Sequence, residues 1–383
     1  MKYKYKCVSV IGARPQFIKA APITRIMDRF GIKEVLVHTG QHYDHNMSKV
    51  FFRELKIREP DYNLGIGSLS HGAQTGRMME RIESVLMKEK PGIVMVYGDT
   101  NSTIAAALAA VKLHIPVAHI EAGLRSYNKK MPEEANRVLT DHVSDILFCP
   151  TQTAVKNLRK EGFTNIINNG RLIEDSFAES RSLDSPAVVN VGDVMYDSVL
   201  FNLSIAKKSP TVLQTYKLSQ KNYCLATIHR AENTDDRTKL ESIFRSFNEI
   251  AQKVPVIIPL HPRTKKLVKD PGRFDKNLTI VPPVAYMDML VLSSSARLIL
   301  TDSGGLQKEA FFLNVPCVTL REETEWVETL RSGMNTLAGT SESKILRAVR
   351  HQERVSLKKR EKRNFGDGNA SERVLNIIKI FLK

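Results

Sequence analysis

The sequence has little of what marks secreted, metal-binding or membrane proteins. Its four cysteines are far apart, form no CxxC pair and have no histidine at a metal-ligand spacing: Cys7, Cys149, Cys224 and Cys317. This pattern predicts reduced thiols in the core of a cytoplasmic protein, and no metal site. No apolar run of about 20 residues occurs, and residues 1–15 lack the apolar segment of a signal peptide. We therefore expect neither secretion nor a membrane span.

Two further absences narrow the choice of ligand. The segment GARPQFIK at 12–19 lacks the G-x-G-x-x-G fingerprint of dinucleotide-binding proteins and supplies one glycine and two cations instead. The formal net charge of +16 is spread over the whole length, and no basic motif is interleaved with aromatic residues. We expect no nucleic acid partner, and we attribute the charge to a polyanionic small substrate and a lysine-rich, solvated surface.

The composition is that of a globular α/β protein, with 42% hydrophobic and 26% charged residues. A chain of 383 residues suggests two domains. Short apolar runs alternate with helical patterns, at 7–11, 35–38, 93–97, 116–120 and 146–149 and then at 188–191, 223–228, 256–260, 278–281 and 298–300. This alternation predicts two doubly wound parallel sheets, with 188–191 as the first strand of the second domain.

Acidic residues follow two predicted strands that should be neighbours in the first sheet. Asp99 follows one strand and Glu121 follows the next, and Glu133, Glu134 and Arg137 come shortly after. Ligands of open α/β sheets bind at the carboxyl ends of the strands, so we expect these side chains at the functional edge. The alternative is that each acid only caps the following helix. Two strand-end acids followed by a third acidic cluster favour chemistry.

Cations at the first helix mark a candidate anion site in the first domain. Arg14 and Lys19 lie at the start of the helix that follows the first strand, and we expect this helix to run from Pro15 to Arg29. A helix N-terminus with cations beside it suits an anion. A solvated surface position for both residues is the alternative.

The second domain has a candidate phosphate site at TDSGG, 301–305. Ser303, Gly304 and Gly305 open a helix and present backbone N–H groups there. His229 and Arg263 follow neighbouring strands. A single histidine in such a place is more often a capping or core residue. Together these residues indicate a site for a nucleoside diphosphate.

Eight motifs spread over nearly the whole chain match, in the same order, the motifs of one known family. They are GARPQFIKAAPI, HTGQHYD, VYGDTNST, HIEAGLRS, MPEEANR, HRAEN, LHPRT and TDSGGLQKEA. Together they resemble the non-hydrolysing UDP-N-acetylglucosamine 2-epimerases. The resemblance implies a GT-B fold, which is two Rossmann-like domains, here 1–187 and 188–366, with a cleft between them. It also implies a C-terminal helix, 367–383, that crosses back to the first domain.

The resemblance implies a reaction as well. UDP leaves by anti elimination, which gives a 2-acetamidoglucal, and returns by syn addition with C2 inverted. UDP-N-acetylglucosamine and UDP-N-acetylmannosamine are interconverted without a redox cofactor or metal, which agrees with the missing dinucleotide fingerprint. The expected partners are the UDP-2-acetamido sugar, UDP and a second copy of the chain in a homodimer. The expected setting is polysaccharide or lipopolysaccharide biosynthesis in the cytoplasm.

Motif by motif, the resemblance implies roles for single residues. The catalytic groups are Asp99, Glu121, Glu133 and His229. The substrate-binding groups are Arg14, Lys19, Arg137, Tyr286, Met289, Ser303, Gly304, Gly305 and Glu309. The carboxylates would remove and return the C2 proton, and crowding would separate their pKa values so that one is a base while another stays an acid. The stretch 286–289 would form the platform for uracil.

The chain departs from the family pattern at three places. Trp326 stands where a cation is expected near the substrate. The segment 68–74 lacks the basic residue that helps many bacterial members to hold a second, regulatory UDP-N-acetylglucosamine. The polar segment 165–188 is longer than the usual connection.

The segment TEWVE at 324–328 resembles the branch that acts on UDP-2,3-diacetamido-2,3-dideoxyglucuronate. A uronate needs a cation for its carboxylate, and Arg125, Lys129 and Lys130 are candidates. A solvated basic turn is the alternative for these residues. A hydrolysing 2-epimerase, a GT-B glycosyltransferase and a nucleotide-sugar sensor without catalysis are the other functions that share part of the pattern. We rank the UDP-N-acetylglucosamine epimerase first.

Overall fold

A computed structural model describes residues 3–41, 52–173, 186–208, 211–260, 262–268, 274–354 and 364–383. The chain divides into two compact units. Unit 1 comprises Met1–Ser198 and Arg363–Lys383, and unit 2 comprises Val199–Lys362. In the described part of the chain, no helix has both the length and the apolar character needed to cross a membrane.

Unit 1 is built on a parallel sheet of seven strands in the order β3-β2-β1-β4-β5-β6-β7. The strands are β1 (Tyr5–Ile11), β2 (Ile32–His38), β3 (Tyr62–Asn63), β4 (Ile93–Tyr97), β5 (Val117–Ile120), β6 (Ile146–Cys149) and β7 (Ala187–Asn190). The helices are α1 (Arg14–Thr24), η1 (Met27–Phe30), α3 (His71–Glu89), α4 (Asn101–Lys112), α5 (Pro132–Val143), α6 (Gln152–Lys160), η2 (Ile167–Gly170), α7 (Val194–Ala206), which runs on into unit 2, and α16 (Ala370–Phe381).

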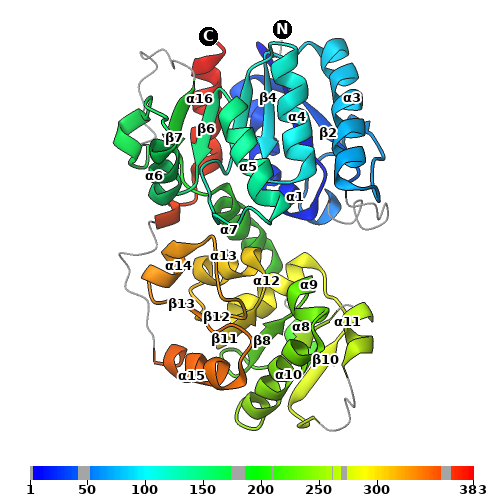
Figure 1. Cartoon of the computed structure of the whole chain (residues 1–383), viewed down its shortest axis with the longest axis vertical. Coiled ribbons are helices and arrows are strands. Elements are labelled where there is room, and N and C mark those ends of the chain that lie inside the picture. Colours follow the sequence, from blue (N-terminus) through cyan, green and yellow to red (C-terminus); the bar gives the residue numbers. More distant parts are fainter. Residues whose placement is uncertain are drawn as a thin grey trace. The chain divides into compact units, whose positions relative to one another are not determined.

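The strands of this sheet are nearly continuous apolar runs because helices cover both faces. On one face, Val8 and Val10 of β1 and Val94 of β4 belong to a core shared with Met78 of α3 and Ala106 of α4. Figure 1 shows α3, α4 and α5 side by side on the near face of this sheet. The small side chains of α4 let that helix lie close to the strands.

The C-terminal helix belongs to unit 1, where α16 contacts α1 and η1. Its first turn is capped by a side chain of another helix. Asp197 of α7 accepts hydrogen bonds from the backbone N–H groups of Ala370 at 3.2 Å and Ser371 at 2.7 Å. A buried carboxylate therefore joins α7 to the start of α16.

Two expected elements differ in the structure. The strand predicted at 188–191 to open the second domain is β7, which pairs in register with β6 of the first sheet, Val188 opposite Leu147. Alternation along the chain predicts that a strand exists but not which sheet it joins. The helix expected from Pro15 to Arg29 is α1, which ends at Thr24 and is followed by η1. Most of the long polar segment, 174–185, lies outside the described residues.

Unit 2 repeats the design with six parallel strands in the order β10-β9-β8-β11-β12-β13. The strands are β8 (Cys224–Thr227), β9 (Val256–Pro259), β10 (Leu278–Val281), β11 (Leu298–Thr301), β12 (Cys317–Thr319) and β13 (Asn335–Leu337). The helices are α8 (Thr211–Thr215), α9 (Ala231–Thr234), α10 (Arg237–Ala251), α11 (Pro262–Leu267), α12 (Tyr286–Ser295), α13 (Gly304–Phe312), α14 (Val327–Arg331) and α15 (Glu342–Gln352).

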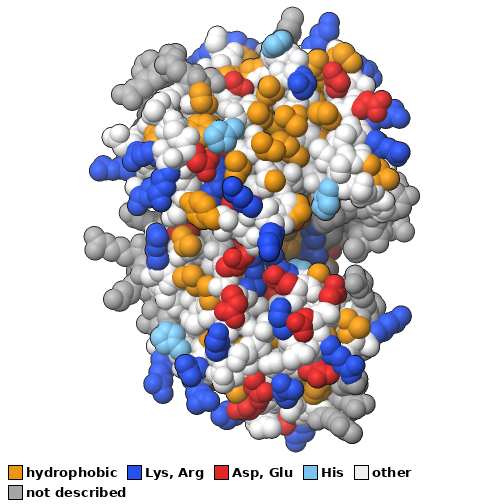
Figure 2. Space-filling view, viewed as in Figure 1, with side chains coloured by type: hydrophobic (Ala, Val, Ile, Leu, Met, Phe, Trp, Pro, Cys, Tyr) orange, Lys and Arg blue, Asp and Glu red, His pale blue; other side chains and the backbone are white. Residues whose placement is uncertain are grey.

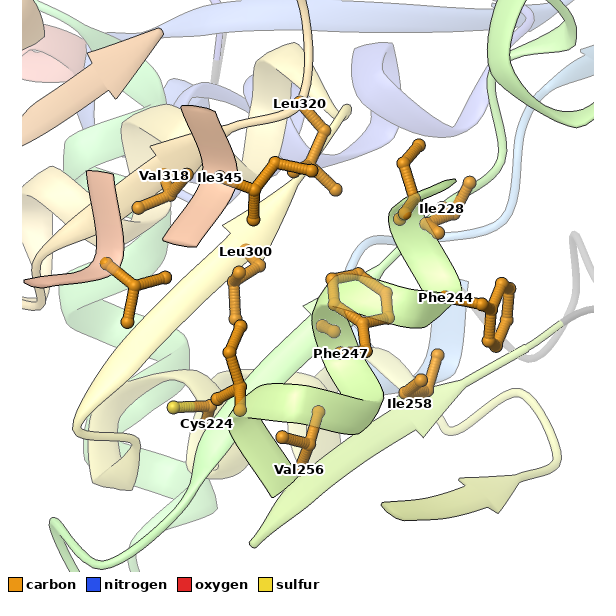
Figure 3. Close-up of a cluster of buried hydrophobic side chains, with 14 of the residues drawn as sticks. Cys224, Ile228, Phe244, Phe247, Val256, Ile258, Leu300, Val318, Leu320 and Ile345 are labelled. Carbon is orange, nitrogen blue, oxygen red and sulfur yellow. The ribbon is translucent and has the colours of Figure 1, made fainter. Parts of the chain in front are cut away.

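Aromatic side chains of α10 anchor this second sheet. Phe244 and Phe247 pack with Ile258 of β9 and Leu300 of β11 in one buried cluster, to which Ile345 of α15 also belongs (Figure 3). Phe247 is fully buried, so its truncation to alanine should cost about 3–5 kcal/mol. The carboxyl ends of the strands are thereby held on a rigid frame.

Both sheets reverse their strand order at one point, between β1 and β4 in unit 1 and between β8 and β11 in unit 2. Ligands of doubly wound sheets bind outside the carboxyl ends of the strands at such a switch point. The candidate groups named from the sequence follow β4 and the neighbouring β5 in unit 1, and β8 and β11 in unit 2.

Candidate active site

The turns after β4 and β5 use left-handed backbone. Gly98 has φ +63°, Gly123 has φ +79°, and between them in sequence Glu121 has φ +75° without being a glycine. Such a conformation costs a non-glycine residue on the order of 1–3 kcal/mol, and it persists where the surroundings fix it. The N–H groups of Glu121 and Ala122 both donate to the carbonyl of Phe148 at 3.1 Å. The carboxylate of Glu121 is thus aimed by a strained, anchored turn.

Glu121 pairs with a cation from the first helix. Lys19 Nζ, one turn into α1, donates to Glu121 Oε1, and the two side chains are only 10% and 5% exposed. A Cβ on Gly98 would lie 2.9 Å from Lys19 Nζ. Gly98 therefore needs to be glycine because of its backbone angle, and a side chain there would also displace the end of Lys19.

Asp99 pairs with a second buried cation. Arg137 of α5 donates through Nη2 to Asp99 Oδ2 and through Nη1 to Glu134 Oε2, the latter at 2.5 Å. The Asp99 side chain is 26% exposed and Arg137 only 6%. The backbone oxygen of Asp99 also accepts a hydrogen bond from Asn136 Nδ2 at 3.1 Å. Asp99 thus keeps a solvent-facing carboxylate on a fixed support.

The third acidic cluster contains two adjacent glutamates, Glu133 and Glu134, with different surroundings. Glu133 is exposed on the first turn of α5, whereas Glu134 is buried and holds Arg137. Glu134 also accepts hydrogen bonds from the N–H groups of Ser126 at 3.0 Å and Tyr127 at 2.8 Å. Burial alone would raise the pKa of Glu134, but these hydrogen bonds and the charge of Arg137 lower it below its usual value. The sequence did not assign this supporting role to Glu134.

The other expected cations of unit 1 differ in their exposure. Arg14 is exposed at the start of α1. Arg125, considered as a partner for a substrate carboxylate, is buried, because its guanidinium binds Asp141 at 2.7 Å and Glu161 at 2.6 Å. That hypothesis is wrong for Arg125, while Lys129 and Lys130 are exposed.

In unit 2 the histidine after β8 is held by the acid after β11. Asp302 is fully buried, and its Oδ1 lies 3.2 Å from His229 Nδ1. The same carboxylate accepts hydrogen bonds from the N–H group of Arg230 at 3.0 Å and from Asn233 Nδ2 at 3.2 Å. Burial raises the pKa of Asp302, but His229 and these hydrogen bonds lower it below its usual value overall. The imidazole itself is 58% exposed, so Nε2 is accessible from solvent.

The helix after Asp302 begins with two glycines. Ser303 caps α13 by accepting the N–H of Leu306 at 3.4 Å, and Gly304 and Gly305 form the first turn. First-turn N–H groups of a helix have no intrahelical acceptor, so they can bind an anion. A Cβ on Gly304 would lie 2.4 Å from Glu325 Oε1. A carboxylate of the segment 321–328 therefore lies against this helix start.

The remaining expected contacts of unit 2 are less accessible. Tyr286 is 2% exposed and Glu309 is 5% exposed, while Met289 is partly buried against the core that contains Val291 and Leu292. His261 and the side chain of Arg263 lie outside the described residues.

Trp326 stands where a cation is expected, and its ring is in contact with a lysine. It is buried, and Lys308 Nζ of α13 lies 4.0 Å from the centre of its ring. Thr324 fixes the same segment by donating to Gln307 Oε1 at 2.7 Å. Lys308 thus supplies positive charge next to this segment, where the expected cation is replaced by Trp326.

The comparisons with known proteins agree on a family. Residues 25–379 match the family model described as UDP-N-acetylglucosamine 2-epimerase. The chain belongs to the UDP-N-acetylglucosamine 2-epimerase family. It is 50% identical to a UDP-N-acetylglucosamine 2-epimerase homolog of Methanococcus maripaludis, over 98% of this chain and 99% of the relative. It is 48% identical to the UDP-2,3-diacetamido-2,3-dideoxy-D-glucuronate 2-epimerase of Pseudomonas aeruginosa, over 97% of this chain and 99% of that one.

A solved structure of this epimerase family has the same fold. The Methanocaldococcus jannaschii UDP-GlcNAc 2-epimerase, in complex with UDP-GlcNAc and UDP, is 42% identical, with a TM-score of 0.83 over 97% of this chain and 99% of that chain. The predicted fold class, α/β with two GT-B-like Rossmann domains, is confirmed, and so is the assignment to the isomerases.

Proposed function

We propose that the protein interconverts UDP-N-acetylglucosamine and UDP-N-acetylmannosamine without hydrolysis. A base removes the proton on C2 while the bond between C1 and the UDP oxygen breaks, which leaves a C1=C2 double bond and free UDP. UDP then adds back to C1, and an acid returns a proton to the other face of C2. The observation that carries the proposal is the pair of strand-end carboxylates, Asp99 and Glu121, each fixed by its own buried cation.

Unit 1 supplies the proton transfer in this proposal. The Lys19–Glu121 pair can hold or release a proton inside a buried hydrogen bond, and Asp99 faces solvent on the other strand end. Arg137 and Lys19 add positive charge where negative charge develops during elimination. We infer supporting roles for Glu134, which holds Arg137, and for Arg14 at the start of α1.

Unit 2 supplies the seat for UDP. The N-terminus of α13 and the exposed Nε2 of His229 favour a diphosphate, and they favour the leaving group more as its charge increases. Asp302 supports this role because a carboxylate on Nδ1 fixes the tautomer and makes Nε2 a better donor or base.

The runner-up substrate is the diacetamido uronate. The 48% identity to the Pseudomonas aeruginosa enzyme and Trp326 favour it. The burial of Arg125 removes one of three candidate partners for its carboxylate. Measuring kcat/KM for both sugars decides the order, and a preference of more than about tenfold for the uronate, roughly 1.4 kcal/mol, would reverse our ranking.

Turnover in deuterated water tests the reaction. Product NMR should show deuterium at C2 and an intact nucleotide sugar. Hydrogen retained at C2 throughout turnover would contradict elimination. Release of free sugar together with UDP would instead identify a hydrolysing epimerase.

We also propose that the protein acts as a homodimer, in the cytoplasm. Hydrophobic side chains gather over α4 on the face of unit 1 seen in Figure 2, and Leu139 of the neighbouring α5 is 54% exposed. Contiguous apolar surface of this kind marks interfaces. Leu139→Glu should shift the molar mass in analytical ultracentrifugation from dimer to monomer, and a monomeric wild type would contradict the proposal.

A further inference from the structure

Four ionisable residues linked by hydrogen bonds lie behind the two acidic turns of unit 1, three of them buried and the fourth, Glu161, partly exposed. His119 Nδ1 lies 2.7 Å from Asp141 Oδ1, and Asp141 Oδ2 accepts from Arg125 Nη1 at 2.7 Å. Arg125 continues to Glu161 with two hydrogen bonds of 2.6 Å. The His119 and Asp141 side chains are 0% exposed and Arg125 is 1% exposed. We call these four residues the charge chain.

The contacts of His119 place an oxygen atom at each ring nitrogen. Its Nε2 lies 2.8 Å from the carbonyl oxygen of Gly98, which can only accept, so Nε2 carries a proton. Its Nδ1 faces Asp141, which also receives Arg125 and the N–H of Gly123. Burial raises the pKa of Asp141, but His119 and Arg125 lower it below its usual value overall, so this carboxylate is ionised and accepts as well. Both ring nitrogens of His119 therefore face oxygen atoms that accept hydrogen bonds.

His119 and Asp141 each bind a backbone group of one acidic turn, the carbonyl of Gly98 and the N–H of Gly123. Gly98, whose carbonyl accepts from His119, directly precedes Asp99. Gly123, whose N–H donates to Asp141 Oδ2 at 3.0 Å, follows Glu121 by two residues. Both glycines have left-handed φ angles, so neither turn is held by ordinary backbone preference. One His–Asp pair thus connects the backbones that carry both acids.

We propose that His119 is a positioning residue for proton transfer, whose buried ring holds the Gly98–Asp99 peptide at a fixed distance from the Glu121–Gly123 turn. It acts through Asp141 and the backbone and does not touch the substrate. The inference rests on the proposed function, because Asp99 and Glu121 are the groups that it positions. A displacement of about 1 Å in such groups can cost about 10²-fold in rate.

Two substitutions separate the two hydrogen bonds of the ring. The amide of His119→Asn can replace Nδ1 and reach Asp141 but not Gly98, whereas His119→Gln can place a donor near Nε2 and reach Gly98. We expect kcat to fall by about 10²-fold in the Asn variant and by roughly tenfold less in the Gln variant, with UDP affinity unchanged in both. His142→Gln is the matched control, because His142 is exposed at the far end of the chain on Glu161, and it should keep wild-type kcat.

A merely structural histidine would give a different result. Both folded variants would then lose stability but keep kcat, and that outcome would overturn the proposal. Equal losses of kcat in the Asn and Gln variants would also contradict it, because the effect would not depend on the contact with Gly98.

The contact with Gly98 can be tested in the wild type even if the variants fail to fold. With ¹⁵N-labelled histidine, one of the ten imidazoles should show an N–H proton that exchanges slowly with solvent, because Nε2 is buried against the carbonyl of Gly98. Fast exchange at all ten rings would overturn the inference. If the wild type turned over neither sugar, the proposed function would fail, but this NMR result would still decide whether the buried hydrogen bond exists.

Discussion

The two units share one sheet topology, yet their strand ends carry charge in opposite ways. In unit 1 the acids after β4 and β5 are paired with buried cations, Lys19 and Arg137. In unit 2 the histidine after β8 is largely exposed and is held by Asp302, and the start of α13 is glycine-rich and lies close to the carboxylate of Glu325. The fold fixes where a site can form, and the side chains at the switch point decide its chemistry.

The difference suits the proposed division of labour. Proton transfer at carbon needs acid–base groups held in fixed positions, so unit 1 pairs each acid with a buried cation. Binding and release of a diphosphate needs accessible donors, and unit 2 keeps the His229 side chain exposed and opens α13 with two glycines. The predictions below test whether the two sets of groups really have separate effects.

Removing the acids of unit 1 should give the largest effect. Asp99→Asn and Glu121→Gln should each lower kcat by about 10²–10⁴-fold, because a positioned acid–base group is lost, while the Kd for UDP stays near that of the wild type. Steady-state kinetics and calorimetry with UDP measure the two quantities. Wild-type kcat in both variants, or a matching loss of UDP affinity, would remove the distinction between the units.

The strand-end acids could be predicted from the sequence, and their support could not. Asp99 and Glu121 follow apolar runs directly, so their places at the sheet edge follow from topology alone. Arg125 was judged by its neighbours in a basic loop, but its contacts with Asp141 and Glu161 are 16 and 36 residues away along the chain. Only the folded chain brings such groups together.

The choice of side chains that α5 buries shows a second limit of prediction from the sequence. This helix buries Glu134, Arg137 and Asp141 and exposes Leu139, the reverse of a usual amphipathic helix. The spacing of three and four residues between its buried charges is a signal that could have singled out Glu134 over Glu133. Hydrophobic patterning predicts that the charged residues of a helix face solvent, and this prediction fails where function requires buried charged residues.

Two buried aspartates should respond to pH in opposite ways. Burial raises the pKa of Asp197 in unit 1 to about 6, against the hydrogen bonds of the α16 amides, whereas the pKa of Asp302 in unit 2 is lowered. A carboxyl group with a raised native pKa binds extra protons in the native state. Its contribution to the free energy of unfolding is therefore lost as pH rises from about 4 to 6, by up to about 3 kcal/mol.

Asp197→Asn removes this pH dependence but keeps an oxygen as acceptor. The variant should gain stability relative to the wild type by about 2 kcal/mol between pH 4.5 and 7.5, measured by urea unfolding at both pH values. Asp302→Asn is the opposite control and should destabilise the protein at pH 7.5, since it neutralises a favoured carboxylate. Parallel pH profiles for the wild type and Asp197→Asn would show that the Asp197 carboxyl is not perturbed.

Two glycine substitutions distinguish backbone strain from crowding. Gly98→Ala forces a side chain into φ +63° and should cost about 1–2 kcal/mol of stability, whatever stands at position 19. In Gly304→Ala the new Cβ would lie 2.4 Å from Glu325 Oε1, so Glu325→Ala should restore any loss in the double variant. Thermal unfolding of both series measures this. Rescue of Gly98→Ala by Lys19→Ala would mean that crowding, not strain, requires the glycine in unit 1.

His229→Gln should give the smallest effect, and it completes the comparison from the side of unit 2. The imidazole is 58% exposed, so its contact with a diphosphate is screened by solvent and salt. We expect the Kd for UDP to rise by roughly tenfold, about 1.4 kcal/mol, and the increase to shrink at high ionic strength. Calorimetry at two salt concentrations measures both. His351→Gln, an exposed histidine on α15 of the same unit, should leave the Kd unchanged. If His229→Gln instead kept wild-type UDP affinity and lowered only kcat, the histidine would belong with the proton-transfer groups, and the separation of roles between the two units would fail.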